Sequence, residues 1–179
     1  GHGVLVGTLN VNDDGTVKLT GGTSSLGWNT NRVTTLNING GRVEADGAQH
    51  IWNMTGGLNF SGGGALLGNS TNSATGYHWE WGGTNVTVSN PTSEAEISGR
   101  IRLRLDTTQP TFTVADGVAV NDLLISAAIT QSSGGGAITK AGAGTLTLSG
   151  GNSYTGATTV NGGTLQAGST TAFGSNSAV

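Results

Sequence analysis

Residues 141–169 read AGAGTLTLSGGNSYTGATTVNGGTLQAGS, and this stretch decides the fold. It predicts two short strands, Thr145–Leu148 and Thr158–Leu165, with a glycine-rich turn between them and an interruption of the second strand at residues 161–163. Apolar side chains in both strands alternate with polar ones, mostly threonine. This alternation between flanking glycines is typical of a β-strand with one buried face.

The same arrangement of a strand, a small polar corner and a second strand recurs upstream. It occurs at residues 8–19, 35–45, 57–67, 85–97 and 111–125. A unit of this size that recurs along a chain favours a solenoid over other all-β folds. We therefore expect parallel strands that stack around one continuous core. The predicted core residues are Leu9, Leu36, Leu58, Val86 or Val88, Phe112 and Leu146.

Three motifs of the stretch also point to a family. They are Gly142–Gly150 (GAGTLTLSG), Asn152–Gly156 (NSYTG) and Thr158–Leu165 (TTVNGGTL). Together they resemble the passenger-associated β-strand repeat of bacterial autotransporters, over about a sixth of the chain. The resemblance implies a right-handed parallel β-helix, here of about six to seven coils, in an exported bacterial protein that is secreted or held at the cell surface. It implies no activity, because such a repeat is a structural unit.

The length and composition fit a single β-helix domain over residues 1–179. Periodic leucine, valine and isoleucine predict a packed core even though 33 residues are glycine and only 9% are charged. No amphipathic helical run is present, so we expect almost no helix. The chain begins and ends within the repeating pattern, which predicts that it is a piece of a longer, multidomain protein.

Several classes of function are disfavoured. The chain has no cysteine, and its net charge of −3 does not suit a nucleic-acid partner. No apolar run approaches the roughly 18 residues of a membrane span. The ten carboxylates are scattered, the three histidines lie far apart, and Asp13–Asp14 is interpreted as a solvated turn. We expect no enzyme activity, no cofactor and no bound metal.

Residues 77–81 (YHWEW) form a second informative stretch. A period of two places Tyr77, Trp79 and Trp81 on one side of a strand, and His78 and Glu80 on the other. Because the interior of a β-helix is narrow, we expect the three aromatic rings to face outward as a shelf. The alternative is an aromatic stack inside the solenoid, or a ring that covers an open end.

All four tryptophans lie in the first 81 residues, and three successive ones are about one coil apart. Two coils span about 10 Å, a distance that suits the sugars of a polysaccharide. The predicted glycan-binding residues are the aromatic Trp28, Trp52, Tyr77, Trp79 and Trp81, with the polar Arg32, Asn29, Asn53 and Glu80 beside them.

Arginines at positions 100, 102 and 104 alternate with Ile101, Leu103 and Leu105, which predicts a half-buried strand with a basic outer face. One interpretation is a ladder that pairs these arginines with glutamates of a neighbouring coil. The other is recognition of uronic acid carboxylates, which arginine binds with two parallel hydrogen bonds.

Three functions stay open from the sequence. The first is a non-catalytic module that binds a plant cell-wall β-glycan, with xylan favoured, and that is tethered to a glycoside hydrolase or other domains. In overall character the chain is similar to the β-helical, xylan-binding carbohydrate-binding modules. The second is a stalk or adhesin segment of an autotransporter-like surface protein. The third is a fragment of a β-helical polysaccharide lyase or hydrolase. In the first case the partner is a polysaccharide, with neither nucleic acid nor membrane involved.

Overall fold

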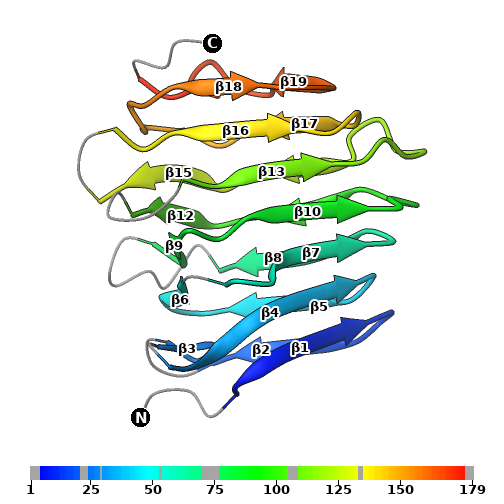
Figure 1. The fold of residues 1–179 in the computed structure, drawn as a ribbon, viewed down its shortest axis with the longest axis vertical. Coiled ribbons are helices and arrows are strands. Elements are labelled where there is room, and N and C mark those ends of the chain that lie inside the picture. Colours follow the sequence, from blue (N-terminus) through cyan, green and yellow to red (C-terminus); the bar gives the residue numbers. More distant parts are fainter. Residues whose placement is uncertain are drawn as a thin grey trace.

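The chain winds into a parallel β-solenoid whose coils stack along its long axis, from the N-terminal to the C-terminal end (Figure 1). The computed structural model describes residues 5–20, 24–28, 30–52, 54–69, 77–104, 109–132 and 135–175, with the side chains of residues 28, 49, 50 and 52 left aside. No helix occurs among the described residues, as the sequence predicts.

Three sheets form the sides of the solenoid. The first sheet contains β1 (Gly7–Asn12), β4 (Asn31–Asn39), β7 (Gly57–Ser61), β10 (Val86–Ser89), β13 (Thr111–Val114), β16 (Ile138–Ala141) and β18 (Thr158–Val160). The second contains β2 (Thr16–Leu19), β5 (Arg42–Ala45), β8 (Gly64–Gly68), β11 (Ala95–Ile97), β14 (Leu123–Ile125), β17 (Thr145–Leu148) and β19 (Thr164–Ala167). The third contains β6 (Gln49–Trp52), β9 (Trp79–Gly82), β12 (Arg100–Leu103) and β15 (Ala128–Gln131).

The complete turns number about five, slightly fewer than the six to seven coils that the sequence predicts. The third sheet forms a third side from the second turn on. In the first turn the short β3 (Gly27–Trp28) pairs antiparallel with β4 as a branch of the first sheet and also contacts β6 of the third. Two further coils, β16–β17 and β18–β19, have described strands on only two sides. The expected strand at residues 158–165 is therefore two strands, which bend at Asn161–Gly163 into different sheets.

The strand register confirms most of the predicted core. Leu9, Leu36, Leu58, Val86 and Phe112 are successive neighbours in the first sheet. Leu146 belongs to the second sheet, between Leu123 and Leu165. All of these are buried except Leu9 and Leu165, which are partly buried in end coils. Burial of such a side chain contributes about 1.5–3 kcal/mol, so one continuous column stabilises every coil it crosses.

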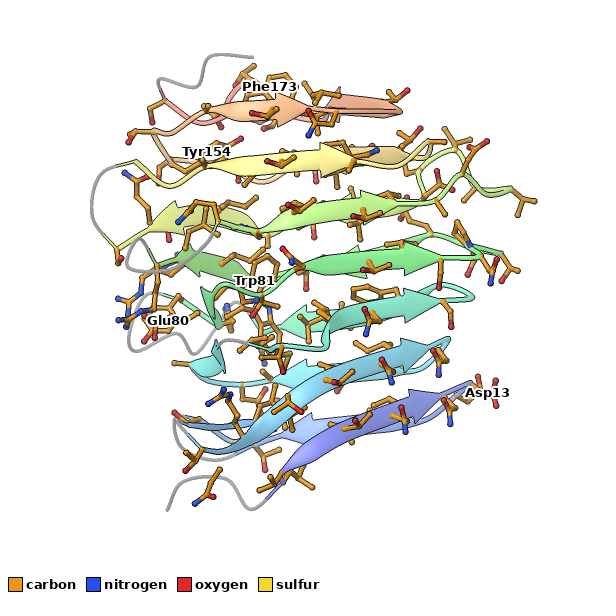
Figure 2. The ribbon with its side chains drawn as sticks, in the orientation of Figure 1. Asp13, Glu80, Trp81, Tyr154 and Phe173 are labelled. Carbon is orange, nitrogen blue, oxygen red and sulfur yellow. The ribbon has the colours of Figure 1, made fainter. Side chains whose placement is uncertain are left out.

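Small polar corners join the first sheet to the second. Asp13 adopts a positive φ of 47°, and its N–H donates to the Asn39 carbonyl at 2.7 Å. Figure 2 shows Asp13 at the outer edge of the first coil. The Asp13–Asp14 pair is therefore a turn, as predicted. At a later corner Gly163 has a φ of 66°, and a Cβ there would lie 2.4 Å from the Gly142 carbonyl oxygen, so stacking of these corners requires glycine.

The last coil is expected to exchange its amide hydrogens fastest. β18 and β19 each pair with a strand on one side only, and most of β19 is exposed. Local opening of such edge strands exposes little buried apolar surface, so it costs less free energy than opening β10 or β11 in the middle. Hydrogen exchange followed by mass spectrometry measures this difference. Equal protection of β19 and β11 in a monomeric chain would contradict it.

Candidate functional site

Trp79 and Trp81 belong to the core of the solenoid, whereas Tyr77 is buried against Glu80 and Arg102 on the outer side of the third sheet, so the predicted outward shelf of three rings is wrong. Trp79 and Trp81 are 0% and 1% exposed, and Tyr77 is 7% exposed. A three-sided solenoid has an interior wide enough for indole rings. Trp79 Nε1 donates to the Ser98 carbonyl at 2.9 Å, and the Trp81 ring packs against Phe112 of the first sheet with centroids 5.9 Å apart. Both indole rings are therefore internal, as the alternative predicts, and the aromatic contact of Trp81 (labelled in Figure 2) is with Phe112.

The other predicted glycan-binding residues do not complete a surface in the described part of the chain. The backbone of Trp28 lies in β3 and that of Trp52 ends β6, and their side chains are outside the described set. Asn29 and Asn53 are outside the described residues. Arg32 is half-buried in β4, opposite Gly27. Of the predicted set, the structure brings Tyr77 and Glu80 into contact.

Glu80 forms the centre of a buried ionic cluster on the third sheet. Its carboxylate accepts hydrogen bonds from Arg102, one of them from Nε at 3.0 Å, and Arg104 Nη1 lies 3.5 Å from the same oxygen. The Tyr77 hydroxyl donates to the second carboxylate oxygen at 3.3 Å. The Arg102 guanidinium also lies 4.0 Å from the centre of the Tyr77 ring, at cation–π distance. Burial, and then the Glu80 charge, raise the pKa of Tyr77.

This cluster supports the ladder interpretation of the arginines. Glu80 and Arg102 are register neighbours across β9 and β12, while Ile101 and Leu103 are buried on the opposite side of β12. Leu105 lies outside the described residues. The Glu80 side chain is only 2% exposed, and Arg102 already directs two of its nitrogens to it. The glutamate thus neutralises charge within the wall of the solenoid.

Replacing Glu80 with glutamine is expected to lower the free energy of unfolding by about 1.5–3 kcal/mol, because charged hydrogen bonds to the arginines are lost. The matched control is Glu96→Gln, at a carboxylate that accepts one exposed hydrogen bond from Ser126 Oγ at 3.1 Å. The control substitution should change the free energy of unfolding by no more than about 0.5 kcal/mol. Urea unfolding followed by tryptophan fluorescence compares the two. Equal costs would show that the cluster contributes no more than a surface contact.

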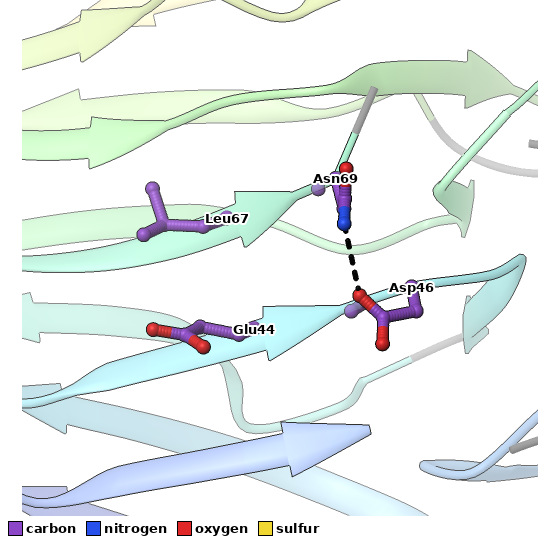
Figure 3. Close-up of a pocket in the computed structure, with 6 residues that line it drawn as sticks. Glu44, Asp46, Leu67 and Asn69 are labelled. Carbon is purple, nitrogen blue, oxygen red and sulfur yellow. Dashed lines mark hydrogen bonds between the residues drawn. The ribbon is translucent and has the colours of Figure 1, made fainter. Parts of the chain in front are cut away.

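A small depression on the second sheet is the other candidate site (Figure 3). It is lined by residues of β5 and β8 and the turns after them, among them Glu44, Asp46, Leu67 and Asn69. Glu44 lies 3.8 Å from Lys18 Nζ, and Asn69 Nδ2 donates to Asp46 at 3.2 Å. Its volume of about 160 Å³ is below the range of small-molecule pockets. The depression therefore gives no reason to assign a ligand.

Across the described ranges, no cluster of three or more histidine, aspartate or glutamate side chains is arranged to hold a metal ion. The same residues contain no helix with the length and hydropathy needed to cross a membrane.

Lys140 is the residue that the sequence analysis missed. It lies on β16 between Phe112 and Val160 and points into the solenoid, with 0% of its surface exposed. Its Nζ donates to three backbone carbonyls, those of Ala141 at 2.9 Å, Gly142 at 2.8 Å and Gly162 at 3.0 Å. Ile138 is buried, and alternation along the strand predicts that Lys140, two residues later, points to the same side. This pattern is the signal by which the sequence could have identified Lys140.

The buried Asp122 carboxylate supplies the opposite charge in this region. Its Oδ2 accepts the Thr145 N–H at 2.8 Å, and its side chain is 1% exposed. Burial lowers the pKa of the Lys140 ammonium, and the charge of Asp122 acts in the opposite direction. Lys140 and Asp122 thus hold three successive coils together at the corner between the first and second sheets.

Two side chains of the NSYTG motif complete the coil that lacks a third strand. Asn152 is buried, accepts the Ile129 N–H at 2.7 Å and donates to the Ala172 carbonyl at 2.5 Å. Its amide therefore links the coil before it to the coil after it, as a strand would. Tyr154 is fully buried, and its hydroxyl is 2.8 Å from Thr158 Oγ1. The polar residues of the motif thus have structural roles.

One of three comparisons with known proteins finds a match, and it covers this region of the chain. Residues 138–167 match one family model, described as a passenger-associated-transport-repeat. No curated protein and no solved structure matches the chain. The match includes Lys140, Asn152 and Tyr154, whose contacts join successive coils. Residues 138–167 thus match the passenger-associated-transport-repeat and fold as the coils β16–β17 and β18–β19 of a parallel β-solenoid.

Proposed function

We propose that this chain is a non-catalytic structural segment of an autotransporter-like passenger, secreted or displayed at the bacterial surface. The observation that carries the proposal is the transport repeat at residues 138–167, which continues the strand ladders of the preceding coils. In this role the solenoid is a rod whose length is set by the number of coils.

The buried polar groups bind other parts of the same chain, which supports a scaffold role for the protein. Glu80 is bound by Arg102 and Tyr77, Lys140 by three carbonyls, and Asn152 by the coils on both sides. A catalytic acid or base has to reach a substrate, whereas these groups face other parts of the chain. Their hydrogen bonds hold coils in register, which is what a rod requires.

Recognition of xylan through a tryptophan shelf receives no such support. That hypothesis depended on exposed rings at Trp79 and Trp81, and both rings are in the core. We therefore retain the surface-segment hypothesis in place of the aromatic platform.

Surface display tests the proposal. The chain, with an epitope at its N-terminus, is fused between an export leader and an outer-membrane translocator domain in a Gram-negative host. We expect antibody labelling of intact cells and release of a compact, protease-resistant fragment. The matched control carries Val88→Pro, which removes a ladder N–H within β10 and should abolish the resistant fragment. Retention of the normal chain inside the cell, although the isolated chain folds, would overturn the proposal.

A further inference from the structure

The outward face of the first sheet differs from the other two sides of the solenoid. From the Thr8–Thr35 pair to Thr159, its outward side chains are threonine, asparagine, serine or alanine, and none is charged or aromatic. The second sheet carries Lys18 and Glu44 on its outer side, and the third carries Glu80 and Arg102. Figures 1 and 2 show the first sheet from this outer side, from β1 to β18. We name it the neutral face.

Side-chain ladders fix the N-terminal half of the neutral face. Asn37 Nδ2 donates to Asn10 at 2.7 Å, and Asn59 Nδ2 donates to Asn37 at 2.9 Å. A second ladder runs parallel to it, in which Asn39 donates to Asn12 at 2.8 Å and Ser61 to Asn39 at 2.6 Å. A carboxamide has two N–H donors and two acceptor lone pairs, and this ladder uses one of each at Asn37. The amides are thus oriented by the protein and keep hydrogen-bonding capacity for a partner.

In the C-terminal half of the neutral face, most of the outward side chains are threonines. Thr87 and Thr113 are register neighbours, and so are Thr111 and Thr139. Among the described residues, none of these four hydroxyls has a hydrogen-bond partner within the protein. A β-branched side chain has a stiff χ1, so each hydroxyl keeps a defined position. Successive rungs lie about 4.8 Å apart, which makes the face a regular array of donors and acceptors.

We propose that the neutral face binds an uncharged linear polysaccharide that lies along the solenoid axis, across the strands. A charged polymer would have to lose hydration without gaining an opposite charge from this face. A protein partner usually buries aromatic or large apolar side chains, and the neutral face offers none. A neutral polysaccharide carries hydroxyl groups that both donate and accept, and its sugars repeat on the scale of one rung, so it complements the array.

Two further properties favour this partner. The ladders pre-order the amides, which reduces the entropy that is lost on binding. The face also changes from asparagine to threonine along the axis, so it is not a uniform lattice of the kind that a crystal surface such as ice would require. The binding uses no tryptophan, and it does not depend on the surface-segment proposal.

Affinity gel electrophoresis of the whole chain tests the proposal, with mannan, xylan, mixed-linkage β-glucan and amorphous cellulose as neutral probes. Alginate and polygalacturonate are the charged probes. The test variant is Thr87→Lys/Thr113→Lys, which places two bulky charges on the neutral face. The control is Thr16→Lys/Gln166→Lys, which adds the same charge on the outer side of the second sheet. Circular dichroism verifies that both variants fold.

We expect retardation by at least one neutral polysaccharide, weakened ten-fold or more in the Thr87→Lys/Thr113→Lys variant and unchanged in the control. Any of four results would overturn the proposal: no retardation by a neutral probe, equal binding by both variants, stronger binding of the charged probes, or inhibition of ice growth without polysaccharide binding. A failure here leaves the display experiment unaffected, because that experiment does not involve a glycan.

Discussion

Replacing Lys140 with alanine is expected to lower the free energy of unfolding by about 3–5 kcal/mol. The change removes the ammonium donor that three backbone carbonyls, of Ala141, Gly142 and Gly162, share. It also leaves the buried Asp122 without the positive charge that balances it. The lost side chain in addition leaves a cavity between Phe112 and Val160.

The matched control for this prediction is Lys18→Ala on β2. Lys18 has a side chain that is 67% exposed and lies 3.8 Å from Glu44, so its loss should cost less than about 1 kcal/mol. The variant Lys140→Met keeps much of the side-chain volume but loses the ammonium group. Its free energy of unfolding therefore separates the cost of the lost hydrogen bonds and charge from the cost of the cavity. Urea unfolding of the three variants, followed by circular dichroism, gives the comparison. If Lys140→Ala costs no more than Lys18→Ala, the buried ammonium does not hold the coils together.

Replacing Trp81 with alanine is expected to lower the free energy of unfolding by about 3–5 kcal/mol, the range for truncation of a buried aromatic side chain. Trp81 is 1% exposed, pairs in register with Ile51 and Leu103, and packs against Phe112. The ring therefore joins the third sheet to the first across the interior. Its loss would weaken contacts on two sides of the solenoid at once.

Trp81→Phe is the control for this change. The Trp81 Nε1–H is buried and has no hydrogen-bond partner among the described residues, so phenylalanine removes a desolvated donor along with part of the ring. We expect it to cost less than half as much as alanine in thermal and urea unfolding. A Trp81→Ala variant as stable as the parent would indicate an exposed ring and would restore the outward shelf.

The sequence predicts the parallel stacking well, because the alternation of apolar and polar residues survives in each coil. Leu36, Leu58 and Phe112 are in the core for the reason that the pattern gives. The orientation of Trp79 and Trp81 could not be obtained in the same way. The alternation predicts that both rings point to the same side of the strand. Whether that side is the interior depends on how wide the interior is, and this width depends on the number of sides in each coil. That number depends on loops whose lengths vary from coil to coil.

The ionic residues illustrate a second limit. The alternating arginines predict pairing with a glutamate of another coil, and Glu80 is that partner. Glu94 and Glu96 are closer in sequence to the arginines, but the stacking of β9 on β12 selects Glu80. The three carbonyls that bind Lys140 are harder still to predict from sequence, because one of them, that of Gly162, belongs to the next coil. Contacts between coils depend on register, which local patterns only partly determine.

Small-angle X-ray scattering of a chain with one duplicated coil tests most directly the central claim, that in-register coils form a rod. Residues 112–139 make one coil, because Phe112 is the register neighbour of Lys140, and a second copy is inserted after Thr139. A control copy that ends at Ile138 shifts the alternation by one residue, which turns inward side chains outward. We expect that the in-register duplication keeps the cross-section and lengthens the particle by about 4.8 Å, while the shifted copy disrupts folding. A duplicated chain with a changed cross-section or an unfolded profile, or a shifted copy that folds equally well, would contradict it.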